Sequence, residues 1–354
     1  MSYFVIFYYT ALIAASTVLA YLKWHQWFKF LFTLTLISFV VGIIGGESAL
    51  RNIATFFAVL ALAAGISYTF REFLVLIASA NLAKELKTAP LTAAFGMFVI
   101  FTIAIMAVFA PVIAPHGQAE VISGAFAPPD ETMLLGADQL GRDIFSRIIY
   151  GARNSVGLAL AATLLAFTMG ALAGLYAAVK GGILDNLLGR VADVIMSVPS
   201  LIFALLMLSI FGTNLIVIVI VVAVIYSPRV FRLTRAVAGN IVVMDYIEAA
   251  KLRGEGDWYL IRREILPNSL APLIAEFGLE FCFVFLLIAG LSFLGLGIQP
   301  PTADWGSMVR ENATLISFGD MTPLIPAAAI ALLTVAVNFV VDWMLFRSSG
   351  LKER

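Results

Sequence analysis

Charged residues are scarce in this chain, and their scarcity indicates its class. Only 12% of its 354 residues are Asp, Glu, Lys or Arg and 62% are hydrophobic, whereas a soluble domain is usually about 25% charged. The charges cancel to a formal net charge of zero, so no basic surface is available for nucleic acid. The composition excludes an ordinary soluble domain and predicts an all-α polytopic membrane protein.

Residues suited to catalysis or metal binding are also few. The single cysteine, Cys282, lies in a hydrophobic run, and the two histidines, His25 and His116, stand alone in predicted loops. No Lys follows a Gly, so the chain has no phosphate-binding GxxxxGK(S/T) loop. No nucleophile–base pair or two-metal arrangement is present either. We therefore predict that the chain is not an enzyme and holds no catalytic residue, metal or cofactor.

Long apolar stretches dominate the sequence instead. A membrane-spanning helix needs about 20 apolar residues. Nine stretches are candidate spans: 3–22, 30–46, 52–70, 91–113, 156–179, 191–211, 214–233, 271–294 and 323–346. Seventeen lysines and arginines fall on one side of such a membrane and five on the other. Because positive charge collects in cytoplasmic segments, this bias predicts an N-terminus outside and a C-terminus in the cytoplasm.

The longest polar run between candidate spans is residues 245–268. Asp245 and Glu248 have the spacing of a helix-capping box, and Gly254 is placed to end the helix that they begin. Asp257 is predicted to cap a second short helix, which Pro267 would end. A run this polar between membrane spans lies in water or against a protein partner.

The same run resembles the EAA loop of binding-protein-dependent ABC importer permeases. Glu248-Ala249-Ala250, Gly254 and Pro267 follow the spacing of that family, although its usual Ile three residues before the Pro is Glu264 here. The resemblance implies a coupling helix that docks on an ATPase subunit. Its expected coupling residues are Glu248, Ala249, Ala250, Arg253, Gly254 and Pro267. The alternative is that Glu248 merely caps a helix on a solvated loop.

From Pro90 onward the chain resembles the C-type permease subunit of oligopeptide, dipeptide and nickel importers. The blocks that carry the likeness are LGADQLGRD at 135–143, YGAR at 150–153, SFLGLG at 292–297, QPP at 299–301 and WG at 305–306. The resemblance implies the six-span core of a type I importer permease, with the first three spans as an addition.

This resemblance also implies partners and a location. The chain would form half of a pore beside a homologous B-type permease subunit in the cytoplasmic (inner) membrane of a prokaryote. Two ABC ATPase subunits would hold ATP and Mg, and an extracytoplasmic binding protein would deliver a peptide or similar small solute. Peptide, nickel, opine and sugar-phosphate solutes are all compatible with the scaffold.

These interpretations divide the chain into five regions. They are an extra N-terminal transmembrane block at 1–72, an amphipathic interfacial segment at 73–90, the first core span and outer loop at 91–150, the ABC permease domain at 151–346, and a cytoplasmic tail at 347–354. The amphipathic stretch has a simpler alternative, in which it prolongs the third span.

Three residues of the outer loop, Asp138, Arg142 and Asp143, are candidates for outer docking. Asp143 is predicted to cap a helix that turns Arg142 and Arg147 outward. The loop either forms a scoop that rests on the outer surface or contacts the binding protein directly.

Glu276 and Glu280 are unusual because they lie within the eighth candidate span. They are four residues apart and so share a helix face. A charged side chain at mid-membrane costs about 2.5–3.5 kcal/mol on insertion scales, so the pair needs water, a cation or the interface. The two carboxylates either line the inner translocation path or anchor the arginines of the 245–268 run. The family often has a Glu where this chain has Ile288, so its substrate contacts do not carry over.

Gly170 and Gly174 form a GxxxG pair in the fifth candidate span. Small residues let helix backbones approach closely inside a membrane. The pair is expected to pack within the subunit or, alternatively, against a second permease subunit.

An ion-gradient-driven secondary transporter or channel is the alternative function. It would need paired ionisable residues at mid-membrane and inverted repeats. Glu276 and Glu280 supply such a pair, but the sequence has no clear repeat. A membrane-embedded enzyme is a third hypothesis, which the missing catalytic residues disfavour.

Overall fold

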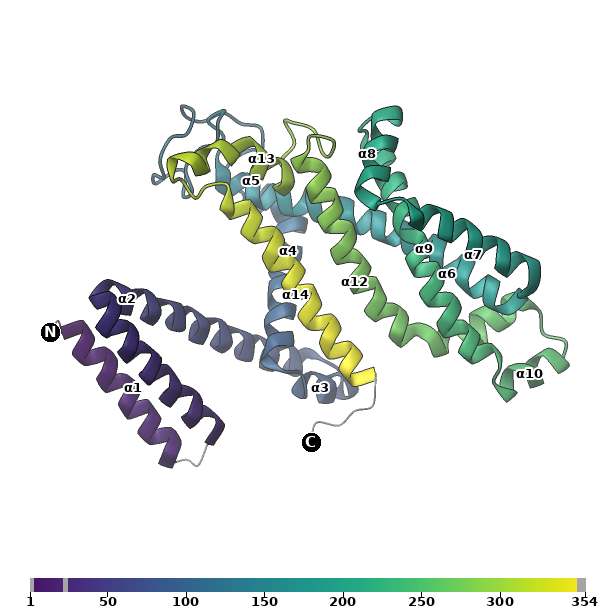
Figure 1. The fold of residues 1–354 in the computed structure, drawn as a ribbon, viewed down its shortest axis with the longest axis horizontal. Coiled ribbons are helices and arrows are strands. Elements are labelled where there is room, and N and C mark those ends of the chain that lie inside the picture. Colours follow the sequence, from purple (N-terminus) through teal and green to yellow (C-terminus); the bar gives the residue numbers. More distant parts are fainter. Residues whose placement is uncertain (1–2, 22–24, 349–354) are drawn as a thin grey trace. The chain divides into compact units, whose positions relative to one another are not determined.

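The computed structural model describes residues 3–21 and 25–348, which form helices joined by loops (Figure 1). Within these ranges no β-strand occurs. The chain divides into two compact units, Met1–Lys87 and Thr88–Arg354. The prediction of an all-α membrane protein is therefore confirmed. Lys23, Lys352 and Arg354, which the charge count placed on the cytoplasmic side, lie outside the described residues.

The first unit contains the helices α1 (Tyr3–Tyr21), α2 (His25–Ile77) and α3 (Ala80–Lys87). α2 consists of two arms that meet at Gly46, whose φ of 69° is a left-handed conformation open to glycine. The loop predicted between the second and third spans is thus a bend at one glycine. Ile44–Ile77 is long and apolar enough to cross a membrane, whereas Phe7–Leu19 and Lys29–Gly42 are shorter apolar helices.

The interfacial segment predicted at 73–90 is divided into two pieces. α2 continues to Ile77, so its end prolongs the third predicted span. α3 then forms a separate short helix with Lys84 and Lys87 in its last turn. Cations favour that position because the C-terminal end of a helix dipole is negative.

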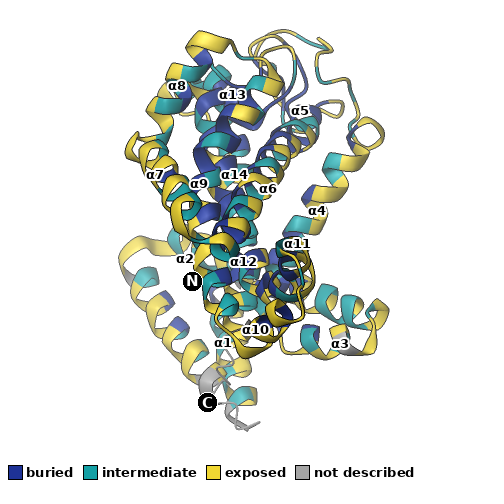
Figure 2. Ribbon diagram, turned by 90° about the vertical axis from the view of Figure 1, so that its right-hand side faces the viewer, coloured by how far each residue is buried: buried dark blue, intermediate teal, exposed yellow. Residues whose placement is uncertain are grey.

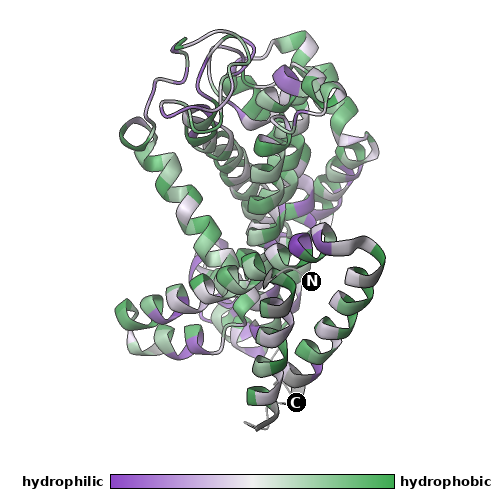
Figure 3. Cartoon of the chain, turned by 90° about the vertical axis from the view of Figure 1, so that its left-hand side faces the viewer, coloured by the Kyte–Doolittle hydropathy of each residue, from purple (hydrophilic) through white to green (hydrophobic). Residues whose placement is uncertain are grey.

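The second unit is a bundle of long helices joined by loops and short helices. Its elements are α4 (Leu91–Ile113), α5 (Ile144–Gly151), the π-turn η1 (Ala152–Val156), α6 (Gly157–Lys180), α7 (Gly182–Ser197), α8 (Ser200–Phe211), α9 (Leu215–Val242), α10 (Asp245–Leu252), α11 (Asp257–Tyr259), the π-turn η2 (Leu260–Ile265), α12 (Leu266–Phe293), α13 (Trp305–Asn312), the 3-10 helix η3 (Ala313–Phe318) and α14 (Leu324–Ser348). The helices consist mostly of hydrophobic residues, and hydrophilic residues are concentrated in the connections (Figure 3).

Five helices and one bent helix pair of the second unit are long and apolar enough to cross a membrane, which matches the six core spans that the resemblance implied. Five are long enough alone: α4, α5–α6, α9, α11–α12 and α14. The sixth is the pair α7–α8, which is bent by 88°. Pro199 precedes α8 at this bend, and a proline cannot continue the helix before it.

The core of the second unit lies where α4, α6, α9, α12 and α14 meet (Figure 2). Ala159, Ala162 and Ala166 are fully buried on one face of α6. Their spacing of three and four residues brings them to the same side of the helix. This stripe of small side chains continues into the GxxxG pair.

Gly170 and Gly174 let α6 lie directly against the backbone of α9. A Cβ atom at Gly170 would stand 2.4 Å from the Ser227 carbonyl oxygen, and one at Gly174 would stand 2.8 Å from that of Phe231. No side chain fits in so small a gap. The prediction that the glycines pack within the subunit is therefore confirmed.

We expect Gly170→Leu combined with Gly174→Leu to prevent normal folding. Overpacking costs about 1–3 kcal/mol at each site, and the backbone of α9 cannot move away without disturbing the core. The measurement is the yield of monodisperse protein in detergent and its melting temperature. Gly157→Leu is the matched control on the same helix, because a Cβ atom there meets nothing within 4 Å. Equal yield and melting temperature for the double variant and the control would contradict this packing role.

Candidate functional site

The 245–268 segment forms a sharp helical corner. Gly254, just beyond the end of α10, has a φ of 82°. Its N–H donates to the Lys251 carbonyl at 2.9 Å, and the Glu255 N–H donates to the Ala250 carbonyl at 3.2 Å. These two bonds form a Schellman motif, which satisfies carbonyls at a helix end. The prediction that Gly254 ends the first helix is confirmed.

Neither predicted capping arrangement occurs. Met244 is the N-cap residue of α10, and its carbonyl accepts the Glu248 N–H at 3.3 Å, so the Asp245 carboxylate has no role as a cap. Asp245 and Glu248 instead lie in the first turn, where negative charge favours the helix dipole. Asp257 is likewise the first residue of α11 and pairs with the Lys180 Nζ at 2.6 Å.

Pro267 does not end the second helix, contrary to the prediction. It lies in the first turn of α12, directly after the π-turn η2. η2 joins α11 to α12 without a break, so Asp257–Phe293 is one continuous 37-residue helix. The span predicted to begin at residue 271 therefore reaches back into the polar segment.

The 245–268 segment buries one face and exposes the other. The buried side chains are Ile247, Ala250, Leu260, Ile261 and Ile265, which form a cluster with Leu175 of α6 and Ala238 of α9. Of the predicted coupling residues, Glu248, Ala249, Arg253, Gly254 and Pro267 are exposed. Ala250 is buried, so it holds the segment against the bundle rather than presenting a contact.

Glu276 and Glu280 lie one turn apart on α12. Glu276 is half-buried, whereas Glu280 is 2% exposed and its Oε2 atom has no hydrogen-bond partner in the described chain. Arg229 of α9 lies beside this part of α12, with its guanidinium carbon 4.9 Å from the centre of the Phe283 ring. The described residues lack the contacts that anchoring of the 245–268 arginines would require.

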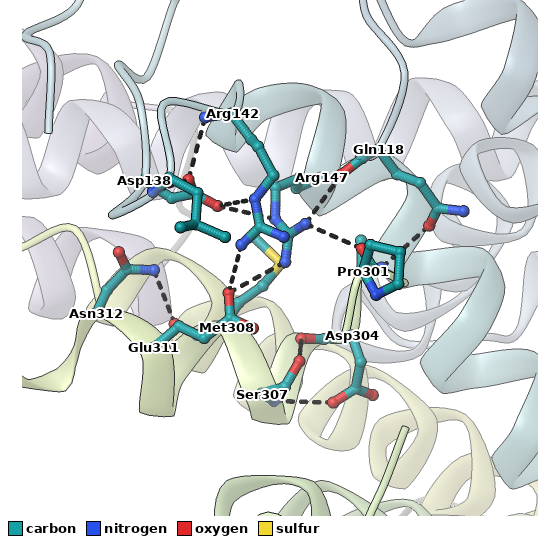
Figure 4. A network of polar contacts seen from close by, with 12 residues as sticks. Gln118, Asp138, Arg142, Arg147, Pro301, Asp304, Ser307, Met308, Glu311 and Asn312 are labelled. Carbon is teal, nitrogen blue, oxygen red and sulfur yellow. Dashed lines mark hydrogen bonds and ion pairs between the residues drawn. The ribbon is translucent and has the colours of Figure 1, made fainter. Parts of the chain in front are cut away.

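Four charged side chains form a buried ion-pair network at the end of the bundle that carries α5 and α13 (Figure 4). Arg142 Nε lies 2.7 Å from Asp138 Oδ2, and Arg142 Nη2 lies 2.8 Å from Glu311 Oε2. Arg147 lies 3.3 Å from the same Asp138 oxygen and 3.2 Å from the same Glu311 oxygen. Two guanidinium groups and two carboxylates balance, which offsets the desolvation of four buried charges.

The ion-pair network ties two loops together. Arg147 Nη1 donates to the backbone carbonyl of Gln118 at 2.9 Å and to that of Pro301 at 3.3 Å. Gln118 belongs to the loop after α4, and Pro301 belongs to the loop before α13. The loops at this end therefore form one rigid layer.

All three predicted outer docking residues are buried. Asp138 and Arg142 belong to the ion-pair network, and Asp143 caps α5 by accepting the Phe145 and Ser146 N–H groups at 3.1 and 3.0 Å, as predicted. None of the three presents its side chain to a docking protein, which favours their role in shaping the loop. The predicted outward orientation of Arg142 and Arg147 is wrong, because both turn inward to a carboxylate distant in sequence.

Sequence reasoning missed Glu311 and Asp304. Asp304 is the N-cap residue of α13, and its carboxylate accepts the Ser307 N–H and the Ser155 hydroxyl, each at 2.8 Å. Burial raises the pKa of the Asp304 carboxyl, and its hydrogen bonds oppose that rise. The spacing from Asp304 to Ser307 was a recognisable capping signal. No sequence signal linked Glu311 to arginines more than 160 residues away.

Comparison with known proteins adds a family match. Residues 166–348 match the family described as binding-protein-dependent transport system inner membrane component. The di/tripeptide transport system permease protein of Pseudomonas aeruginosa is 35% identical over 254 residues, which cover 70% of this chain and 84% of that protein. The probable D,D-dipeptide transport system permease protein of Escherichia coli is 33% identical, covering 74% and 88%. The dipeptide transport system permease protein of Haemophilus influenzae is 35% identical, covering 71% and 87%.

A solved structure of an amino acid ABC transporter with histidines also aligns with part of this chain. The overlap covers 58% of this chain and 94% of that one, with 24% sequence identity and a TM-score of 0.41. A likeness this distant has no bearing on the solute.

We expect Glu311→Gln to lower the melting temperature of the purified protein substantially. The change leaves two buried guanidinium groups with a single carboxylate, that of Asp138, and breaking a buried pair typically costs about 3–5 kcal/mol. The measurement is thermal unfolding in detergent, with Glu131→Gln as the control because Glu131 is exposed in the loop after α4. A shift no larger than that of the control would show that the ion-pair network contributes little to stability.

Proposed function

The chain belongs to the family of binding-protein-dependent transport system inner membrane components, and from that membership we propose that it is the permease through which an ABC importer moves short peptides. It is a multi-pass protein of the inner membrane whose family works with ATPase and binding-protein partners. The family assignment decides against the ion-gradient-driven alternative. A peptide solute is supported by relatives named as di/tripeptide, D,D-dipeptide and dipeptide permeases.

The exposed face of the 245–268 segment is the observation that carries the coupling role. Beside Glu248 and Arg253, this segment exposes Leu252 and Trp258, which are 84% and 64% exposed. Large apolar side chains in an otherwise polar connection indicate a surface that a partner protein covers. The partner proposed here is an ATPase subunit, and Glu248, Ala249, Arg253 and Gly254 lie on the exposed side where it would dock.

The same segment is mechanically joined to the spans. Its buried side chains pack on α6 and α9, and the ion pair between Lys180 and Asp257 ties the end of α6 to α11. The helix Asp257–Phe293 then continues directly into the bundle. A displacement of the docked ATPase would therefore move α12 as a lever rather than bend a loop. Pro267 lies within this lever, in the first turn of α12, and does not end it.

The remaining assignments follow from this arrangement. The 245–268 segment and the C-terminus face the cytoplasm, the N-terminus lies outside, and the layer of loops around α13 faces the binding protein. The chain forms the pore with a homologous B-type permease subunit. Two ATPase subunits hold ATP and Mg, and this chain performs no catalysis itself. The excess of basic residues on the cytoplasmic side supports the orientation.

We expect Glu248→Lys and Gly254→Trp each to abolish peptide transport while the spans remain inserted. The lysine introduced by Glu248→Lys would oppose the dipole at the start of α10. A tryptophan side chain at a φ of 82° would be strained and would also obstruct the docking surface. The measurement is ATP hydrolysis by the reconstituted complex in response to the loaded binding protein, which both variants should lose.

Gly254→Asn is the matched control for this prediction. Asn tolerates the left-handed conformation that ends α10 and adds little bulk, so we expect transport close to that of the wild type. Wild-type transport by both Glu248→Lys and Gly254→Trp would mean that the 245–268 segment is an ordinary solvated connection.

Deletion of residues 1–87 should leave assembly with the ATPase subunits intact. The six membrane-crossing units and the 245–268 segment all lie in the second compact unit. Co-purification of the ATPase subunits with the truncated chain is the measurement. Loss of these subunits from a truncated chain that still inserts into the membrane would show that the first unit is required for assembly.

A further inference from the structure

Three charged side chains in the middle of the second unit form no ion pair within the described chain. Arg229 lies at the centre of α9 and Glu280 at the centre of α12, two 28-residue helices that pack against each other (Figure 1). Glu276 lies one turn before Glu280 on the same helix face. We call Arg229, Glu276 and Glu280 the α9–α12 charged cluster.

Lipid cannot cover this cluster at low cost. Arg229 is exposed, and its guanidinium carbon lies 4.9 Å from the centre of the Phe283 ring and 5.5 Å from that of Tyr226. Arg229 belongs to a helix that is long and apolar enough to cross a membrane, where a charged side chain that faces hydrocarbon is costly. This side of α9 therefore faces water, a solute or another polar chain in the assembled transporter.

Glu280 requires a hydrogen-bond donor that the described chain does not supply. Its Oε2 atom is buried without a hydrogen-bond partner, and no Arg229 nitrogen lies within 4.0 Å of either carboxylate. A buried polar atom without a partner is costly. A hydrogen-bond donor would satisfy this oxygen, and a cation forms the strongest such bond with a carboxylate.

We propose that the α9–α12 charged cluster is a binding site inside the membrane for the ammonium group of the transported peptide. The proposal rests on the peptide importer function given above. Glu276, half-exposed, meets the ammonium group first, and Glu280 accepts from it deeper in the bundle. Arg229 faces the peptide carboxylate and limits the net negative charge of the empty site. A zwitterionic peptide thus finds a partner for each of its termini.

The test uses the complete transporter in proteoliposomes with its binding protein. A defined mixture of di- and tripeptides is supplied, and uptake is measured by mass spectrometry alongside ATP hydrolysis. We expect Glu276→Gln and Glu280→Gln each to lower peptide uptake about tenfold or more, the loss typical of removing one charge-assisted hydrogen bond. ATP hydrolysis stimulated by the loaded binding protein should stay within about twofold of the wild type, because docking and coupling occur at other surfaces. Glu131→Gln, far along the chain in an exposed loop, is the matched control and should match the wild type.

Each other result overturns a specific claim. Uptake by both variants equal to that of the control would mean that the cluster does not bind solute. Loss of the second permease subunit from the purified variant complexes would mean that a basic side chain of that subunit, rather than the peptide, is the missing cation. Glu276→Gln keeps the test informative if Glu280→Gln misfolds, because Glu276 is only half-buried. Failure of the wild-type complex to take up any peptide would overturn the proposed function together with this inference.

Discussion

A charged side chain that is removed from water needs a partner, and the charges of this chain are placed accordingly. At the end of the bundle near α13, two arginines and two carboxylates neutralise one another within one buried network. Along α9, Arg232 pairs with Asp193 and Arg235 pairs with Asp185, which fastens α7 to α9. The α9–α12 charged cluster differs from these groups because its partners are not supplied by the described chain.

The second constraint is that lipid provides little hydrophobic force between helices, so close backbone packing must hold them together. Gly170 and Gly174 meet this need by bringing α6 against α9. The 245–268 segment packs on this helix pair through its buried apolar face. The segment is therefore attached to the most tightly packed part of the bundle, and a force applied to its exposed face is transmitted to several helices together. That rigidity suits a coupling role better than a flexible loop would.

Local patterns in the sequence predicted several features correctly. Gly254 ends α10 because the left-handed conformation needed there is open to glycine, and Asp143 caps α5 because its short carboxylate reaches nearby N–H groups. Predictions that depended on an exact helix boundary were wrong. The cap predicted at Asp245 lies one residue earlier, at Met244, and no helix ends at Pro267, which lies in the first turn of α12. A proline is compatible with both positions, and the direction in which the helix continues decides between them.

The sequence by itself determined the membrane class, the six-span core, the helix corner at Gly254 and the need for a partner at Glu276 and Glu280. These properties depend on composition, on helical spacing and on the cost of charge in hydrocarbon, all of which are local. Only the tertiary structure decided that Arg142 and Arg147 turn inward to Glu311, that Ala250 is buried, and that Arg229 lies over Phe283 of the helix that carries the two glutamates. Such pairings join helices far apart in the chain, and no local pattern specifies which of them will meet.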